Sequence, residues 1–210
     1  MSYLVLVRHG LSEYNKLGLW TGWTDVPLVD EGFEEARKTA NELKDIKFDY
    51  TYTSPLTRSR QTLVEIKKIL GIQNLPNLED PALLERNYGV YTGKNKWQIK
   101  NQVGEEEFRK IRRSWDYPIP EGESLKQVYA REIPYYQEDI LPKLRNGKNV
   151  LITASGNNLR ALVKYLENIP DEEIANLEIG TGEAYVYEID PSGKVVNKQI
   201  RGTNPNAGKV

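Results

Sequence analysis

Short, uninterrupted apolar runs recur along the chain and predict buried strands. Residues 3–7 and 150–154 are almost wholly apolar or β-branched, a pattern typical of strands covered on both faces in a parallel sheet. Residues 48–53 form a further strand candidate. Near the end of the chain, 184–189 and 194–200 flank a Pro-Ser-Gly turn, which predicts a closing hairpin.

Between these runs, apolar residues recur at the three- and four-residue spacing of helices. Asp30 is expected to cap the first helix, whose apolar face carries Phe33, Ala36, Ala40 and Leu43. Two more helices are predicted over 63–70 and 159–166. A longer one is expected to begin after Ser124 and to reach Leu144, bent or interrupted by its internal prolines, Pro134 and Pro142.

The alternation of strands and helices predicts an α/β fold with a mostly parallel central sheet and helices on both faces. The length suits a single domain over residues 1–210. Residues 71–123 are rich in Gly, Pro, Asn and charge, so they are interpreted as a long excursion from the core that contributes to the active site. The polar stretch at about 201–210 is predicted to be a mobile tail.

Composition removes several classes of function. The chain is 39% hydrophobic and 28% charged with a formal net charge of -1, so it lacks the basic excess of a nucleic-acid or anionic-membrane binder. It has no cysteine and one histidine, which argues against disulfides, thiol catalysis and an ordinary zinc site. The apolar runs are too short for a signal peptide or a membrane span, so a cytoplasmic location is predicted.

Polar residues follow two of the predicted buried strands. Arg8, His9 and Gly10 follow the first, and Ser155-Gly156-Asn157 follows a later one. Ligands of α/β sheets bind beyond the carboxyl ends of the strands, so the two segments would share one pocket if the strands are neighbours. Imidazole is a nucleophile near neutral pH, arginine donates in pairs to phosphate, and glycine lets backbone amides approach a ligand. This chemistry suits phosphoryl transfer. A single histidine at a strand end is, however, more often a packing residue without a catalytic role.

An ordered series of further motifs favours the functional interpretation. From about Tyr3 to about Asp190 the chain resembles the cofactor-dependent phosphoglycerate mutases of the histidine phosphatase superfamily. The matching segments are Leu6-Val7-Arg8-His9-Gly10 with Ser12 and Asn15, Thr21-Gly22-Trp23, Thr53-Ser54-Pro55 with Arg58, Glu85-Arg86 with Tyr88-Gly89, residues 92–96, Arg112-Arg113-Ser114, residues 122–125, and Gly156-Asn157 with Leu159-Arg160-Ala161.

The resemblance implies a role for each matching position. His9 would be the phosphorylated nucleophile, Arg8 and Arg58 would hold the transferring phosphoryl group, and Glu85 would be the general acid and base on the substrate hydroxyl. The rest of a phosphoglycerate would be bound by Ser12, Asn15, Thr21, Gly22, Tyr88, Lys96, Arg112, Arg113, Gly156 and Asn157. The implied enzyme belongs to glycolysis and gluconeogenesis. It acts on a small phosphorylated carboxylic acid, is primed by 2,3-bisphosphoglycerate and needs no metal. The resemblance leaves open whether the protein forms a homodimer.

The chain also departs from the family pattern. Ser155 stands where the family has a second catalytic histidine, and His9 is the only histidine, so slow catalysis is predicted. Leu11 replaces the usual Glu or Gln and is interpreted either as harmless packing or as a retuned pocket; Asn87 and Asn158 replace the common His and Ser. Two alternatives to an impaired mutase therefore stay open: a phosphatase acting on a small phosphoester, and a catalytically inactive phospho-ligand binder. Whether Ser155 is natural or engineered also stays open.

Overall fold

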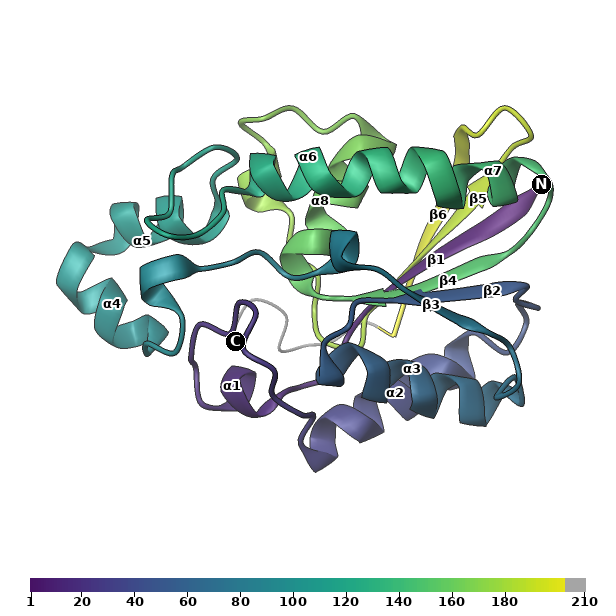
Figure 1. Cartoon of the computed structure of the whole chain (residues 1–210), viewed down its shortest axis with the longest axis horizontal. Helices are drawn as coiled ribbons and strands as arrows, with labels where there is room; N and C mark the ends of the chain where they lie inside the picture. Colours follow the sequence, from purple (N-terminus) through teal and green to yellow (C-terminus); the bar gives the residue numbers. More distant parts are fainter. Residues whose placement is uncertain (203–210) are drawn as a thin grey trace.

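A central sheet of six strands carries the fold in the computed structural model, which describes residues 1–202 (Figure 1). The strand order is β3-β2-β4-β1-β5-β6. Strands β3, β2, β4 and β1 are parallel to one another, whereas β5 and β6 extend the sheet in antiparallel pairing. The predicted mostly parallel sheet is therefore confirmed. The strands are β1 (Ser2–Arg8), β2 (Tyr50–Thr53), β3 (Asn77–Glu79), β4 (Val150–Ala154), β5 (Ala184–Ile189) and β6 (Val195–Arg201).

Helices cover both faces of this sheet, also as predicted. The α-helices are α1 (Glu13–Lys16), α2 (Asp30–Glu42), α3 (Thr57–Leu70), α4 (Lys96–Val103), α5 (Glu105–Arg113), α6 (Leu125–Tyr135), α7 (Leu141–Arg145) and α8 (Gly156–Glu167). Short turns of 3-10 helix are η1 (Pro81–Leu83), η2 (Gly89–Tyr91) and η4 (Ile174–Asn176). Over residues 1–202, no helix is both long and apolar enough to cross a membrane.

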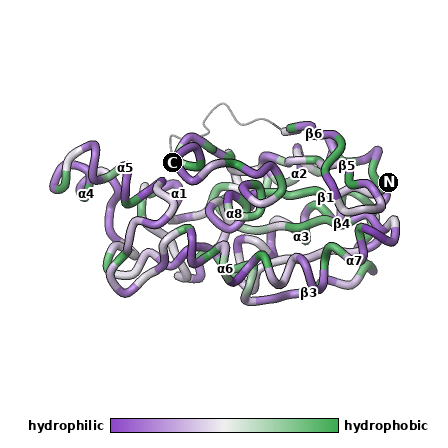
Figure 2. Tube along the Cα trace, turned by 90° about the horizontal axis from the view of Figure 1, so that it is seen from above, coloured by the Kyte–Doolittle hydropathy of each residue, from purple (hydrophilic) through white to green (hydrophobic). Residues whose placement is uncertain are grey.

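The alternation of side chains along β1 assigns each face its own core. Leu4 and Leu6 point into a cluster shared with α6, α7 and α8, whereas Val5 and Val7 point into a cluster shared with α2 and α3. All four side chains are buried, and each stabilises the fold by about 1.5–3 kcal/mol through the apolar area it removes from water. In the perpendicular view of Figure 2, α4 and α5 stand apart at one end of this layered body.

One local expectation, the cap of α2, is wrong, whereas two others are confirmed. Asp30 is the first residue of α2 and not its cap; Val29 holds the cap position, with extended backbone and no side-chain hydrogen bond. Asp30 instead lies in the first turn, where its charge suits the helix dipole. Ser124 does cap α6, through a capping box with Gln127. The long helix after it is interrupted, as its prolines predict, by a π-helical segment over Tyr136–Ile140.

The excursion at 71–123 is more regular than its composition suggests. It carries α4 and α5, which pack on a separate small core of Trp20, Tyr88, Ile99, Phe108, Ile111 and Ile119. Each of these helices buries few apolar residues, Ile99 in α4 and Phe108 and Ile111 in α5, so neither has the broad apolar face of the predicted helices. At the other end of the chain, Arg201 is the last residue of β6, and positions 203–210 of the predicted tail lie outside the described residues.

A buried carboxyl between α6 and α8 makes stability depend on pH. Glu132 is fully buried, and this burial raises the pKa of its carboxyl well above the ordinary value of 4.5; the charge of Glu85 adds to the shift, while Arg131 and the Asn158 amide oppose it. Above pH 4.5 the unfolded chain therefore loses this proton before the folded chain does. The contribution of the neutral Glu132 carboxyl to stability is fully present below that pH, and it is lost as the pH rises through the folded-state pKa.

Glu132→Gln is accordingly expected to raise the free energy of unfolding by about 1–3 kcal/mol at pH 8, because the amide has no charge to bury. The gain should shrink as the pH falls toward 4. Urea unfolding at pH 4, 6 and 8 measures both effects, with Glu138→Gln on the exposed side of the same segment as the control. An identical pH dependence in the original chain and in Glu132→Gln would contradict the assignment.

Candidate active site

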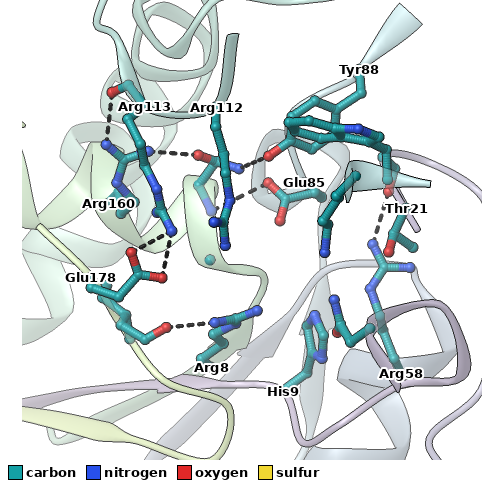
Figure 3. Close-up of a pocket in the computed structure, with 17 residues that line it drawn as sticks. Arg8, His9, Thr21, Arg58, Glu85, Tyr88, Arg112, Arg113, Arg160 and Glu178 are labelled. Atoms are coloured by element: carbon teal, nitrogen blue, oxygen red, sulfur yellow. Dashed lines mark hydrogen bonds and ion pairs between the residues drawn. The ribbon is translucent and has the colours of Figure 1, made fainter. Parts of the chain in front are cut away.

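The two polar segments that follow β1 and β4 meet in one pocket, because the strands are neighbours, which is the condition of the prediction. The strands pair in parallel with Arg8 opposite Ala154, and the His9 backbone N–H donates to the Ala154 carbonyl at 2.9 Å. Figure 3 shows the pocket, which most of the predicted residues line: Arg8, His9, Asn15, Thr21, Gly22, Arg58, Glu85, Tyr88, Lys96, Arg112, Arg113, Gly156 and Asn157. The predicted residues that do not line it are Ser12 and Ser155.

His9 lies at the floor of the pocket with its ring orientation fixed. Its Nδ1 is 2.7 Å from the carbonyl oxygen of Gly10, and because a carbonyl only accepts, Nδ1 carries the hydrogen. The lone pair is then on Nε2. Burial lowers the pKa of His9 well below 6.5, and the positive charges of Arg58 and Arg8 lower it further. The ring is therefore neutral at physiological pH, which is the form that acts as a nucleophile.

The turn after His9 needs glycine because two backbone segments touch there. A Cβ on Gly10 would overlap the carbonyl oxygen of Gly32, and a Cβ on Gly32 would overlap that of Leu11. The Leu11 backbone N–H donates to Glu35 Oε2 at 2.8 Å. The Leu11 side chain is half-buried and does not line the pocket, which favours the packing interpretation of this departure from the family pattern.

Two arginines, the half-buried Arg8 and the buried Arg58, flank His9, and neither guanidinium hydrogen-bonds a carboxylate of residues 1–202. Arg8 donates to the Ile179 carbonyl at 2.6 Å, and Arg58 donates to the carbonyls of Thr24 and Gly22 at 2.9 and 2.8 Å. In the described part of the chain, the Nε of each guanidinium is buried and has no hydrogen-bond partner. Burial lowers the pKa of Arg58 to about 10, so it stays charged near pH 7. Buried cations with unused donors suit an anionic ligand such as a phosphoryl group.

A second group of cations comes from the excursion. Lys96 begins α4, and Arg112 and Arg113 end α5, where their charges suit the negative end of the helix dipole. Burial lowers the pKa of Lys96 to about 7, and the charges of Arg112, Arg8 and Arg113 contribute. Burial, with the charge of Arg113, lowers the pKa of Arg112 to about 10. Within residues 1–202, no group of three or more acidic or histidine side chains is arranged to hold a metal ion.

Glu85 is a carboxylate of this pocket, and four hydrogen bonds fix its position. Its Oε1 accepts from the backbone N–H groups of Arg86 at 2.7 Å and Asn157 at 3.2 Å. Its backbone carbonyl accepts from the Trp23 indole at 2.7 Å and from Arg131 at 3.0 Å. The side chain points toward the centre of the pocket (Figure 3), so it is placed to exchange a proton with a bound alcohol.

Four pocket residues have no assigned role in the sequence interpretation: Trp20, Arg160, Glu178 and Ile179. Arg160 is fully buried and positions two other pocket residues. It donates to Asn157 Oδ1 at 2.8 Å, and Asn157 donates to the Tyr88 hydroxyl at 2.8 Å. The sequence feature that could have indicated a role for Arg160 is its place in the matching segment Leu159-Arg160-Ala161. Glu178 accepts from Arg113 at 2.6 Å, and no motif of the sequence indicates this contact.

The two serines outside the pocket have structural positions. Ser12 caps α1 and donates to Asn15 Oδ1 at 2.8 Å, so it acts on the pocket through Asn15. Ser155 holds the cap position of α8 at the end of β4. Its hydroxyl is completely buried and makes no hydrogen bond to any of residues 1–202.

Comparison with known proteins identifies close relatives over nearly the whole chain. The family model described as histidine phosphatase superfamily (branch 1) matches residues 4–200. A protein of Parvibaculum lavamentivorans named 2,3-bisphosphoglycerate-dependent phosphoglycerate mutase is 44% identical over 199 residues, which cover 94% of this chain and 95% of the relative. A protein of the same name from Bradyrhizobium diazoefficiens is 45% identical over 197 residues, covering 93% and 95% of the two chains.

Solved structures share the fold at lower sequence identity. A mycobacterial glucosyl-3-phosphoglycerate phosphatase complexed with VO3 superposes with a TM-score of 0.83 at 23% identity, over 97% of this chain and 100% of that one. Bacillus stearothermophilus YhfR superposes with a TM-score of 0.83 at 24% identity, over 97% and 98%. These likenesses establish the architecture, whereas the more similar relatives bear on the chemistry.

Proposed function

Because the chain belongs to the histidine phosphatase superfamily and, within it, to the phosphoglycerate mutase family, we propose that it interconverts 3-phosphoglycerate and 2-phosphoglycerate through a phosphohistidine at His9. The observation that carries the proposal is the division of the pocket cations into two groups. Arg8 and Arg58 flank the nucleophile, while Lys96, Arg112 and Arg113 come from the separate helices α4 and α5. A ligand with a phosphate at one end and a carboxylate or second phosphate at the other matches both groups.

The proposed chemistry uses Nε2 of His9 and the carboxylate of Glu85. In the phosphorylated enzyme, the free hydroxyl of 3-phosphoglycerate attacks the phosphorus, the N–P bond breaks, and Glu85 takes the hydroxyl proton. The resulting 2,3-bisphosphoglycerate reorients and transfers its other phosphoryl group to Nε2. The released oxygen regains the proton from Glu85, and 2-phosphoglycerate leaves. Arg8 and Arg58 stabilise the charge on the phosphoryl oxygens in both transfers.

2,3-Bisphosphoglycerate is the proposed primer that first loads His9, and the relatives are named as dependent on this compound. The pocket suits such a group, since the buried Nε atoms of Arg8 and Arg58 are donors that have no partner among the described residues. The primer supplies the phosphoryl group. The chain holds it, keeps His9 neutral and positions Glu85.

Two other functions make different predictions for the same assay. A phosphatase of the kind named among the structural relatives would release inorganic phosphate and form no isomer. An inactive binder, favoured by the withdrawn hydroxyl of Ser155, would bind phosphoglycerate without turnover. The test is conversion of 3-phosphoglycerate to 2-phosphoglycerate with and without 2,3-bisphosphoglycerate, with inorganic phosphate measured in parallel. Isomer formation that the bisphosphate stimulates supports the mutase, whereas either of the other results replaces it.

Ligand binding is expected to take up about one proton per site at pH 8, because the pKa of Lys96 is about 7 in the free pocket and a bound anion restores its charge. The ligand phosphate is already fully ionised at that pH and contributes little. Calorimetric titration with 3-phosphoglycerate in two buffers of different ionisation enthalpy gives the number of protons. Lys96→Arg keeps a charged group and should abolish the uptake. Equal proton uptake in both proteins would contradict this role of Lys96.

A further inference from the structure

The pocket contains a carboxylate that the proposed chemistry does not use. Glu178 lies between η4 and β5, and both of its carboxylate oxygens contact the Arg113 guanidinium, one of them at 2.6 Å. Figure 3 shows this carboxylate directed toward Arg113, on the side of the pocket where Arg8 lies. An acidic side chain in a site for anions repels the ligand, so Glu178 lowers the affinity of the pocket for anions that approach it.

The backbone around Glu178 is held in place. The Glu178 carbonyl accepts from the Tyr185 hydroxyl at 3.2 Å, and the next carbonyl, of Ile179, accepts from Arg8 at 2.6 Å. One segment therefore contacts a cation from each group, Arg8 beside His9 and Arg113 on α5. The Glu178 side chain is 31% exposed and that of Arg113 is 15% exposed, so solvent and ligand can reach the pair.

The charge of Glu178 acts on several pocket cations. Burial lowers the pKa of Arg8, and the carboxylate of Glu178 opposes this shift. The same carboxylate opposes the lowering of the pKa of Arg112 and of Arg160. Glu178 is thus a counter-ion for several arginines of the pocket and not for Arg113 alone. A ligand that contacts Arg113 must compete with this carboxylate.

We propose that Glu178 sets the charge preference of the pocket by holding Arg113 in place of the distal anionic group of a ligand. The repulsion between Glu178 and that group grows with the charge of the group, so a second phosphate suffers more than a carboxylate. The pocket then favours monophosphorylated acids over bisphosphates. The inference rests on the proposed function, since it specifies which ligand of that reaction the site holds weakly. It also implies that the chain needs more 2,3-bisphosphoglycerate for priming than its Glu178→Gln variant.

The test compares the affinities of two ligands by calorimetry at low salt, for the original chain, Glu178→Gln and Glu178→Asp. Glu178→Gln is expected to tighten 2,3-bisphosphoglycerate about tenfold and 3-phosphoglycerate about threefold or less, and the difference should shrink as salt is added. Glu178→Asp keeps the charge and should keep the original ratio. Glu167→Gln, which removes a carboxylate paired with Lys198 at the far end of α8, is the matched control and should change neither affinity.

A purely structural role for Glu178 predicts a different effect of Glu178→Gln on ligand affinity. If the carboxylate only orders Arg113, Glu178→Gln weakens both ligands or leaves their ratio unchanged, and the inference is overturned. Measurements in a His9→Asn background keep the ligands intact. If both ligands bind but the original chain, which keeps His9, forms no isomer, the proposed mutase function is wrong. The ratio of the two affinities still decides the role of Glu178. Absence of binding of either ligand to any variant would overturn both.

Discussion

Replacing Ser155 with histidine is expected to raise the rate of phosphoryl transfer by about 10²–10³-fold. Ser155 follows β4 and precedes Gly156, which lines the pocket, so a longer side chain at 155 starts next to the pocket wall. The serine hydroxyl is buried outside the cavity. An imidazole would add a hydrogen-bond donor where charge develops in the transition state, which is the role that the family resemblance implies for a histidine at this position. The measurement is kcat for conversion of 3-phosphoglycerate to 2-phosphoglycerate, primed with 2,3-bisphosphoglycerate.

Ser155→Gln is the matched control for this gain. Glutamine has a similar reach and a neutral donor, so it should give a smaller increase than histidine if a charge-assisted bond matters. Thermal unfolding of each variant checks that the buried start of α8 tolerates the larger side chain. If Ser155→His folds normally and its rate equals that of the original chain, the idea that Ser155 limits catalysis is wrong. Another group would then supply the donor.

The sheet and the position of His9 could be predicted because their causes are local. Buried strands such as 3–7 and 150–154 are short apolar runs, and His9 directly follows the first of them. The parallel pairing of β1 with β4, which forms the pocket, joins distant parts of the chain and could be stated only as a condition. Helices α4 and α5 escaped detection since each buries few apolar residues against a charged background. Their stability comes from packing around Trp20, which precedes them by more than seventy residues and lies outside any local pattern.

Side-chain direction was the second limit of prediction. Motif membership placed Ser12 and Ser155 with the site, but neither lines the pocket. The Ser12 hydroxyl accepts from the Asn15 backbone at the start of α1, and the Ser155 hydroxyl is buried without a hydrogen bond to residues 1–202. Conversely, the contact of Glu178 with Arg113 joins residues 65 positions apart on a loop and a helix end. Such a pair has no periodicity or spacing in the sequence, and only the folded chain brings it together.

His9→Asn is expected to lower kcat by on the order of 10⁶-fold and to abolish acid-labile phosphate on the protein. The substitution is chosen because the asparagine amide can still donate to the Gly10 carbonyl, as Nδ1 of His9 does, while no nucleophilic nitrogen replaces Nε2. The turn between Gly10 and Gly32 should therefore keep its shape. The measurements are turnover and the stoichiometry of phosphate retained after incubation with labelled 2,3-bisphosphoglycerate.

Ligand affinity distinguishes loss of the nucleophile from loss of the site. Arg8 and Arg58 are anchored by the backbone carbonyls of Ile179, Thr24 and Gly22 and not by His9, so binding of 3-phosphoglycerate to His9→Asn should stay within about threefold of the original value. The chain has no other histidine, so any acid-labile phosphohistidine on the original protein must be at His9. Labelled phosphate retained by His9→Asn at the original level would place the phosphoryl group on a different kind of side chain. The proposed mechanism would then be wrong at its first step, even if isomer still formed.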